Sequence, residues 1–344
     1  MLWTKLFKVF LTHLPPDQLG KKVPASVAVI GSGLSGISAA HKLIDEGFAV
    51  TIFDQGKNPG GRLGLRSLRN LPFINRPVDV GAAYFTVSDN EFRNKVDHWQ
   101  SLDLVHEWTD TFHVFKDYEI TTTTGPMRYG TKKGLRSLAI YELAQLVKKG
   151  ALHFQERKIS SVINSANKIK VDEESFDAVV LAMPGVQAAR IIHDEELKNQ
   201  LNQQVCSPVL SAWFVIDSDT PKYDAMFVND HDVISLIIND GKRRKDNAPV
   251  VNVLTTNNYA KSRLENIDNY LEEIVDHALE IWNIKSEVVE KGITRWSMAQ
   301  VSPSTRVQLP ERMAIVGDAY SDNPRIESAW LDGVAVLNQL PVLN

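Results

Sequence analysis

A short strand–helix–strand unit is the first structure that the pattern of apolar and polar positions predicts. Residues 26–30 form a largely apolar run, which is typical of a buried parallel strand. A glycine-rich turn follows, and apolar residues then recur at helical spacing over residues 37–46 until Gly47 ends the pattern. A second apolar run over residues 49–53 ends at Asp54. This order predicts a compact β-turn-α-β unit.

Two later apolar runs have the length and the flanking turn residues of further strands in the same parallel sheet. Residues 177–182 precede Met-Pro-Gly, and residues 313–316 precede Gly-Asp. In open α/β sheets, ligands bind outside the carboxyl ends of the strands. We therefore expect functional loops directly after both runs.

A different pattern separates these strands and predicts a second domain. Residues 111–124 alternate and are rich in Thr, Phe and Tyr, which is typical of a strand with one exposed face. Residues 240–247 are highly charged, and we expect a solvated loop there. Further strands of a largely antiparallel sheet are expected at residues 207–216, 225–238 and 250–256, with an amphipathic helix at 267–282.

Composition and charge exclude several classes of function. The chain has 344 residues, a formal net charge of -4 and no basic stripe, which argues against a nucleic-acid-binding protein. The single cysteine, Cys206, excludes an internal disulfide, a cysteine zinc cluster and a CxxC redox pair. The nine histidines have no metal-ligand spacing, so we predict no metal site. A reducing, cytoplasmic location is expected.

The first 24 residues form a separate N-terminal arm. This arm is apolar, with Lys5 and Lys8 inside the apolar run, and it is shorter than the roughly 20 apolar residues that span a bilayer. It also lacks the small-residue cleavage site of a secretory signal. We predict an arm packed on the body, and the alternative is an amphipathic helix that contacts a membrane surface.

Gly31, Gly33 and Gly36 form a G-x-G-x-x-G turn between the first strand and its helix. In a dinucleotide-binding fold the first glycine permits the tight turn, the second lets a diphosphate approach the backbone, and the third lets helix and strand pack closely. The helix N-terminus stabilises the phosphate charge. Asp54, at the end of the next strand, is placed to accept hydrogen bonds from a ribose. The sequence therefore predicts a dinucleotide site.

A second glycine turn indicates that the dinucleotide is FAD. Residues 58–62 read Asn-Pro-Gly-Gly-Arg and follow Asp54 by a few positions. Two adjacent glycines bring backbone amides against phosphate or ring atoms, and the arginine adds positive charge. A nicotinamide dehydrogenase has no need of this element, whereas a protein that holds an extended FAD does.

Several segments resemble renalase-like flavoproteins, a branch of the flavin amine oxidase superfamily. Residues 78–86 read VDVGAAYFT and are similar to a flavin-contacting segment of that family. The resemblance covers almost the whole chain after the arm. Its other segments are residues 125–127 (GPM), 294–299 (TRWSMA), 316–319 (VGDA) and 326–333 (IESAWLDG).

This resemblance implies which residues contact FAD. The glycine turns would hold the diphosphate, Gly81 to Tyr84 would approach the isoalloxazine ring, and residues 329–333 would open a last helix whose N-terminus faces the ring. A strand near residues 156–162 would pair with the adenine. The implied cofactor residues are Gly31, Gly33, Leu34, Ser35, Gly36, Asp54, Gln55, Gly60, Gly61, Arg62, Gly81, Ala82, Ala83, Tyr84, Ile159, Val162, Gly317, Asp318, Glu327, Ala329, Trp330 and Gly333.

The resemblance also implies a division of the chain. We predict an α/β protein in which a Rossmann-like FAD-binding domain is interrupted by an α+β substrate domain on a mostly antiparallel sheet. The expected FAD-binding parts are residues 25–95, 131–205 and 296–344, and the expected substrate-domain parts are residues 96–130 and 206–295.

Two features bear on the reaction. Relatives commonly carry an aromatic residue where this chain has Met298, so the substrate is less well defined than the cofactor. Cys206 is far in sequence from the C-terminal segment to which some relatives attach flavin, and we expect FAD to be non-covalent. Candidate substrate-pocket residues are Tyr84, Trp213, Trp296 and Met298.

Three functions stay open at this level. The first is a renalase-like oxidase that takes a hydride from dihydro isomers of NAD(P)H and passes the electrons to oxygen. The second is an amine oxidase or desaturase-like enzyme with an amine or apolar substrate. The third is an FAD-binding protein without turnover. No second Rossmann fingerprint is present, so NAD(P) is expected as a visiting substrate.

Overall fold

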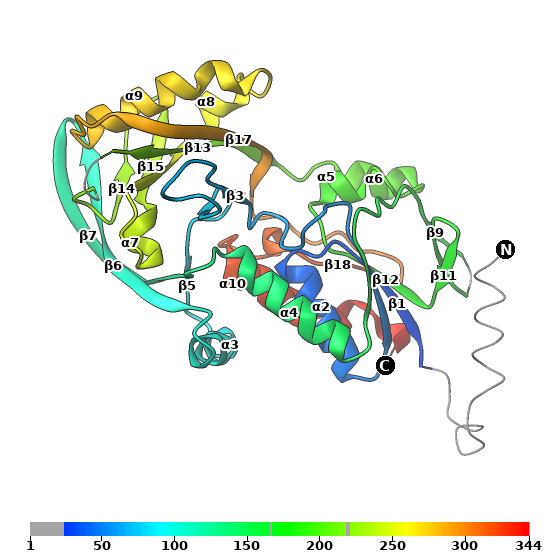
Figure 1. The fold of residues 1–344 in the computed structure, drawn as a ribbon. Coiled ribbons are helices and arrows are strands. Elements are labelled where there is room, and N and C mark those ends of the chain that lie inside the picture. Colours follow the sequence, from blue (N-terminus) through cyan, green and yellow to red (C-terminus); the bar gives the residue numbers. More distant parts are fainter. Residues whose placement is uncertain (1–23, 166, 218–220, 344) are drawn as a thin grey trace.

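The computed structural model of the chain describes residues 24–343 except residues 166 and 218–220. The predicted N-terminal arm therefore lies almost wholly outside the described residues. Two large sheets form the frame (Figure 1), one near each end of the molecule, and the helices pack on them. Within the part of the chain that is described, no helix is long and apolar enough to cross a membrane.

The first sheet is five-stranded and parallel, as the apolar runs predict. β1 pairs with β2 on one side and with β12 on the other, because each strand is a short apolar run that can be buried on both faces. α2 (Leu34–Asp45) and α4 (Arg136–Lys148) lie beside it (Figure 1). In order, the strands are β18 (Met313–Ile315), β12 (Ala178–Leu181), β1 (Ser26–Ile30), β2 (Ala49–Phe53) and β8 (Leu152–Phe154).

The second sheet has eight strands and is mixed. All its pairs are antiparallel except β14 with β6, so the prediction of a mostly antiparallel sheet is confirmed apart from this pair. In order, the strands are β17 (Val288–Val301), β13 (Cys206–Ile216), β16 (Val250–Thr255), β15 (Ile234–Asn239), β14 (Ala225–Val228), β6 (His106–Lys116), β7 (Glu119–Gly130) and β5 (Phe85–Thr86).

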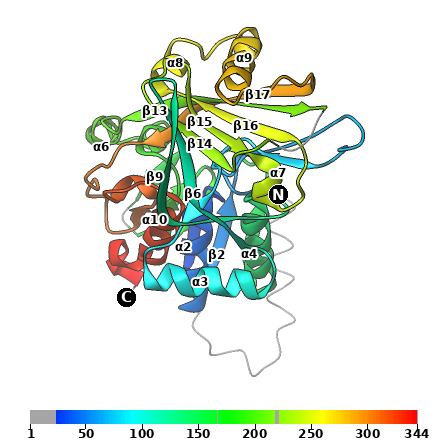
Figure 2. The ribbon, with the colours of Figure 1, turned by 90° about the vertical axis from the view of Figure 1, so that its left-hand side faces the viewer.

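Helices α8 (Asn257–Lys261) and α9 (Leu271–Ile281) cover one face of the eight-stranded sheet, as Figure 2 shows. Ile274, Val275 and Ala278 of α9 are buried against apolar side chains of β13, β15 and β16. The expected amphipathic helix is thus present, with its first turn replaced by a 3-10 turn at Ile267–Tyr270.

Two smaller sheets and several helices complete the described fold. β3 (Leu65–Ser67) and β4 (Pro77–Asp79) form a hairpin, and β11 (Glu174–Phe176), β10 (Ile169–Val171) and β9 (Val162–Asn164) form a three-stranded sheet. The remaining helices are α3 (Asn90–Ser101), α5 (Gly185–Ala188), α6 (Glu195–Leu201), α7 (Asp240–Arg244) and α10 (Ile326–Val334).

The predicted division into domains stays a prediction, and one of its boundaries falls inside a paired strand. The boundary between residues 295 and 296 lies inside β17, which pairs with β13 along most of its length. β5 was assigned to the FAD-binding part, yet it pairs with β7 of the eight-stranded sheet.

The expectation of a solvated loop at residues 240–247 is wrong for residues 240–244, whereas residues 245–247 are exposed and irregular. Residues 240–244 form α7, and the side chains of Asp240, Arg243 and Arg244 are each at most 1% exposed. A dense run of charge is normally solvated, since burying an unpaired ion is costly. Here opposite charges from other segments pair with each ion, and that pairing cannot be read from the local sequence.

A second buried charge joins three helices. Glu142 of α4 is 1% exposed and lies 2.8 Å from His41 of α2, and it accepts hydrogen bonds from Lys95 and Trp99 of α3. Burial by itself raises the pKa of a carboxyl group, but these hydrogen bonds and the charge of Lys95 lower the pKa of Glu142 to about 2.

We expect Glu142→Gln to reduce the free energy of unfolding at neutral pH by about 3 kcal/mol. This figure follows from the difference between the ordinary glutamate pKa of 4.5 and the pKa of about 2 in the folded protein. Because the folded-state pKa is depressed, this stability is present above about pH 4.5 and is lost as the pH falls towards 2. Urea unfolding at several pH values measures it. Glu173→Gln is the control, because the Glu173 side chain is 90% exposed. Equal effects of the two changes would contradict the prediction.

Candidate dinucleotide-binding site

One cavity of about 1200 Å³ collects most of the segments that the sequence singled out. Its wall includes the turn after β1, the turn after β2 and the loop after β18, together with residues of β13, β16 and β17 from the second sheet. Parallel strands end at one edge of their sheet, so these loops meet there. The cavity exceeds the roughly 300–1000 Å³ of an ordinary ligand pocket, which suits an extended dinucleotide.

The first glycine turn forms one side of this cavity. Gly31 has a φ of +113°, and a Cβ on Gly31 would lie against the carbonyl oxygen of Ala182. A Cβ on Gly36 would overlap the carbonyl oxygen of Gly31, so Gly36 allows α2 to begin close to the strand. Gly33 differs, because a Cβ there would meet no atom within 4 Å. Gly33, Leu34 and Ser35 line the cavity at the start of α2.

Asp54 lines the cavity and also holds this turn in place. Its carboxylate accepts hydrogen bonds from the backbone N–H of Ser32 at 2.7 Å, from the Ser32 hydroxyl at 2.5 Å and from the N–H of Gly56 at 2.6 Å. Asp54 Oδ2 accepts both Ser32 hydrogen bonds, and Oδ1 accepts only the one from Gly56, so a ribose hydroxyl could still donate to Oδ1. The contact of Ser32 with Asp54 was not part of the sequence prediction.

The second glycine turn packs directly on the first. Gly60 and Gly61 have φ values of +105° and +52°, and the N–H of Gly60 donates to the carbonyl of Ser32 at 2.8 Å. Arg62 follows and donates to Asp318 at 2.9 Å, which joins this turn to the loop after β18. Sequence reasoning placed Arg62 and Asp318 separately along FAD, and the structure brings them together as an ion pair.

The segment around Gly81 forms another side of the cavity. A Cβ on Gly81 would overlap the carbonyl oxygen of Arg62, and the N–H of Ala82 donates to that oxygen at 3.0 Å. The indole N–H of Trp296 donates to the carbonyl of Val80, and the Trp296 ring lies against Gly64. The sequence-predicted residues Gly81, Ala82, Trp296 and Met298 all line the cavity.

Positive side chains dominate the charge of the wall, and most of them were missed from the sequence. Arg136 begins α4 beside Gly60. The pKa of the Arg136 guanidinium is lowered, mainly by burial and to a smaller extent by the positive charge of Arg66. Arg66 and Arg136 stand alone in the sequence, so no motif points to them. The cationic residues of the wall are Lys57, Arg62, Arg66, Arg136, Arg157, Lys158, Arg190, Arg295 and Arg325, and its acids are Asp54 and Asp318.

Two candidate substrate residues are directed elsewhere. Tyr84 packs against Trp108 and Phe112, with ring centroids 6.1 and 5.3 Å away, and it is absent from the cavity wall. Trp213 is 7% exposed, and its ring packs over Gly292 of β17. The eight-stranded sheet uses both residues in its own packing.

The last helix differs from the expectation in its start and in its contacts. α10 begins at Ile326 and not near Ala329, and Ala329 does line the cavity. Trp330 is buried against Trp99, and Glu327 accepts hydrogen bonds from the N–H groups of Ser88 and Asp89.

Four further residues of the implied FAD set also lie off the cavity wall. Val162 is buried in β9, so the expected adenine strand at residues 156–162 is absent, and residues 158–160 line the cavity as irregular backbone. The others are Gly36 and Gly333, which allow close packing on α2, and Ala83, which is 6% exposed.

Cys206 lies closer to the candidate site than its sequence position suggests. It pairs with Val301 at the start of β13, and Val301 lines the cavity. Burial raises the pKa of the Cys206 thiol. The positive charge of Arg62 lowers this pKa and the negative charge of Asp318 raises it, and both effects are smaller than that of burial. The non-covalent state of FAD stays a prediction.

Comparison with known proteins gives short sequence matches. The family model of the NAD(P)-binding Rossmann-like domain matches residues 29–99. Lysine-specific histone demethylase 1 homolog 1 of Arabidopsis thaliana is 35% identical over 63 residues, which is 18% of this chain and 8% of that protein. Hydroxyneurosporene desaturase of Cereibacter sphaeroides is 33% identical over 101 residues (26% and 19%), and polyamine oxidase 4 of Oryza sativa subsp. japonica is 27% identical over 203 residues (57% and 36%).

The likeness to solved structures covers nearly the whole chain. The structure of putrescine oxidase bound to putrescine superposes with a TM-score of 0.72, covers 93% of this chain and 99% of that one, and is 11% identical in sequence. The chain therefore has the α/β Rossmann-like FAD-binding fold of the flavin amine oxidases. The matched segments span well under half of the length of the curated relatives. None of these matches singles out the renalase-like branch.

Proposed function

We propose that this chain binds FAD in the cavity and is an oxidoreductase of the amine-oxidase and desaturase type. The observation that carries the proposal is the convergence on one cavity of the turn at Gly31–Ser35, the turn at Gly60–Arg62, the segment Gly81–Ala82 and the loop at Gly317–Asp318. The fold of the flavin amine oxidases and the enzymes among the sequence relatives support it.

The residues of the wall divide the work of binding FAD. The N–H groups at the start of α2 and the guanidinium groups of Arg62, Arg66 and Arg136 stabilise the negative charge of the diphosphate. Gly81–Ala82, Trp296 and the start of α10 bound the part of the cavity assigned to the flavin ring. Bound FAD supplies a hydride acceptor, and the protein supplies orientation and a site shielded from water.

Within this function, we infer an anionic substrate and name dihydronicotinamide dinucleotides, including isomers of NAD(P)H, as the class. Both carboxylates of the described cavity wall are already bonded, Asp54 to Ser32 and Gly56 and Asp318 to Arg62. A cationic amine would find no acid there without a partner, whereas Arg295, which forms no ion pair among the described residues, offers positive charge to a substrate phosphate. Oxygen is the proposed electron acceptor.

The alternative is an amine or apolar substrate. Trp296, Met298, Leu254 and Val209 form an apolar part of the wall, which suits such a ligand. Polyamine oxidase and desaturase relatives are named for substrates of these two kinds.

One experiment separates these readings. We expect the purified protein to show the absorption bands of oxidised FAD and to lose the longer-wavelength band, in the blue, when mixed anaerobically with a dihydronicotinamide dinucleotide. Putrescine, spermidine and a carotenoid precursor in detergent serve as comparison substrates. Bleaching by an amine or by the apolar compound alone would overturn the substrate proposal. A flavin that no substrate reduces would favour binding without turnover, and a colourless protein that takes up no added FAD would overturn the cofactor proposal.

A further inference from the structure

A cluster of buried ions joins the substrate-domain helix α7 to the segment that lines the cavity. Asp240 pairs with Arg76 at 2.7 Å, with Arg244 at 2.8 Å and with Arg243. Asp79, at the end of β4, pairs with Arg243 at 3.0 Å and with Arg244 at 2.7 Å. The side chains of Asp79, Asp240, Arg243 and Arg244 are at most 3% exposed. We call these five residues the Asp79–Asp240 cluster.

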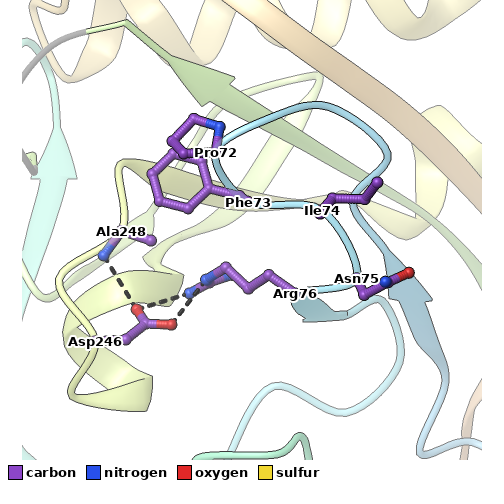
Figure 3. Close-up of a pocket in the computed structure, with 7 residues that line it drawn as sticks. All are labelled: Pro72, Phe73, Ile74, Asn75, Arg76, Asp246 and Ala248. Atoms are coloured by element: carbon purple, nitrogen blue, oxygen red, sulfur yellow. Dashed lines mark hydrogen bonds and ion pairs between the residues drawn. The ribbon is translucent and has the colours of Figure 1, made fainter.

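The cluster reaches the surface at Arg76. Figure 3 shows this side chain reaching towards Asp246 under the loop of residues 72–75, with the Arg76 Nε donating to Asp246 at 2.8 Å. A pocket beside Arg76 is lined by Pro72, Phe73, Asp246 and Ala248. Arg76 therefore closes the solvent side of the cluster, and its other members stay dry.

Arg243 is the member that touches the cavity segment. Its guanidinium donates to the carbonyl oxygen of Ala83, to Asp79 and to Asp240. Asp79 and Ala83 flank Gly81 and Ala82, the two residues of this segment that line the cavity. Arg243 thus holds both ends of a short backbone stretch through one rigid, planar group.

Other hydrogen bonds hold the middle of the same stretch. The N–H of Val80 donates to Gly64 at 3.0 Å, and the N–H of Ala82 donates to Arg62 at 3.0 Å. The second oxygen of Asp79 accepts the N–H of Leu135 at 2.9 Å, directly before Arg136 of α4. The Asp79 carboxylate therefore connects three parts of the structure by hydrogen bonds: the cavity segment, the start of helix α4 that carries Arg136, and helix α7.

Arg244 provides an internal comparison. It has the same two carboxylate partners and the same burial, but its remaining hydrogen bond goes to the carbonyl of Lys132. No hydrogen bond joins it to the described residues 80–83. A buried ion cluster is weak evidence for stability, because apolar replacements are often as stable. A role in orienting backbone should therefore distinguish Arg243 from Arg244.

We propose that Arg243 is a positioning residue, which fixes the Asp79–Ala83 backbone and thereby sets how closely Gly81 and Ala82 approach the flavin ring. The proposal rests on the proposed function, since it assigns that side of the cavity to the ring. A substitution that keeps the positive charge but changes the geometry of the side chain should disturb how closely Gly81 and Ala82 approach the ring. The effect should be large, because a misplacement of about 1 Å at a reacting centre can lower a rate by about 100-fold.

Arg243→Lys and Arg244→Lys form the matched pair that tests this proposal. Both keep the charge and lose the planar fork. Arg243→Lys should shift the visible spectrum and the midpoint potential of bound FAD and should lower the rate constant of flavin reduction roughly 10- to 100-fold, with the substrate KM changed less. Arg244→Lys should leave the spectrum and the midpoint potential unchanged and the rate constant of flavin reduction within about twofold. It should lower the melting temperature by about as much as Arg243→Lys does. Equal changes in both variants, or no spectral change in Arg243→Lys, would overturn the proposal.

A second measurement reads the backbone without FAD. Amide hydrogen exchange of the peptide that contains residues 80–84, measured on the protein stripped of cofactor, should be faster in Arg243→Lys and unchanged in Arg244→Lys. Unchanged exchange in both variants would overturn the positioning role of Arg243 even if the protein never binds FAD. Failure of this proposal can therefore be distinguished from failure of the proposed function. If either lysine variant does not fold, the charge-balanced pairs Arg243→Met with Asp240→Asn and Arg244→Met with Asp240→Asn take their place, with the same two outcomes.

Discussion

A Gly33→Val variant is expected to lose FAD while the protein without cofactor keeps the stability of the unsubstituted chain. Gly33 has φ and ψ of -70° and 173°, which valine adopts readily, and a Cβ there would meet no protein atom within 4 Å. The new side chain would instead project into the cavity beside the start of α2. We expect the dissociation constant for FAD to rise at least ~100-fold, about 2.7 kcal/mol, as measured by titration of FAD fluorescence.

Gly36→Val is the comparison that separates blocking of the site from loss of the fold. Its Cβ would overlap the carbonyl oxygen of Gly31 and approach the Ala182 side chain, so the turn itself must move. We expect this variant to lose both FAD and several degrees of melting temperature, by the mechanism of overpacking. A Gly33→Val protein that binds FAD with unchanged affinity would show that the diphosphate lies elsewhere.

Asp240→Leu is expected to destabilise the protein by about 3–5 kcal/mol, the usual cost of removing one partner from a buried ion pair. Asp240 is fully buried, and the charges of Arg244, Arg243 and Arg76 hold its pKa well below the ordinary range despite the opposing effect of burial. The substitution would leave these three arginines facing Asp79 and the partly exposed Asp246. The change is a large share of the ~5–15 kcal/mol that holds a typical domain folded, and urea unfolding measures it.

A double-mutant cycle tests whether this loss comes from unpaired charge. Adding Arg244→Leu to Asp240→Leu removes one positive charge and should restore part of the lost stability, which gives a coupling energy above ~1 kcal/mol. Glu195→Leu, at an acid whose side chain is 79% exposed, is the control and should change stability by less than ~0.5 kcal/mol. Additive effects of the two core substitutions would contradict the proposed pairing.

Local patterns predicted the parallel sheet and the glycine turns well. The runs at β1, β2, β12 and β18 are short and apolar because both faces of a parallel sheet are buried, so each run is recognisable alone. The turn at Gly31–Gly36 is likewise a local feature, because Gly31 and Gly36 each answer a steric limit imposed by backbone of the same unit or the neighbouring strand.

Prediction was weaker where a residue depends on distant partners. The charged run at residues 240–247 has the composition of a solvated loop, and only Arg76 and Asp79 from the β3–β4 hairpin make its burial favourable. Trp213 and Tyr84 are aromatic residues in strands, and the sequence does not distinguish a strand face that lines a cavity from one that packs on a neighbour. Arg136 entered the site through the placement of α4 alone.

The sequence by itself determined the Rossmann-like core, the dinucleotide turn and four strands of the parallel sheet, because these follow from periodicity and from glycine sterics over short stretches of chain. Only the tertiary structure decided which side chains line the cavity and which ions are paired, such as Arg62 with Asp318 and Arg243 with Asp79. Electrostatic pairing and burial depend on residues more than 150 positions apart in the chain, and no local pattern encodes that proximity.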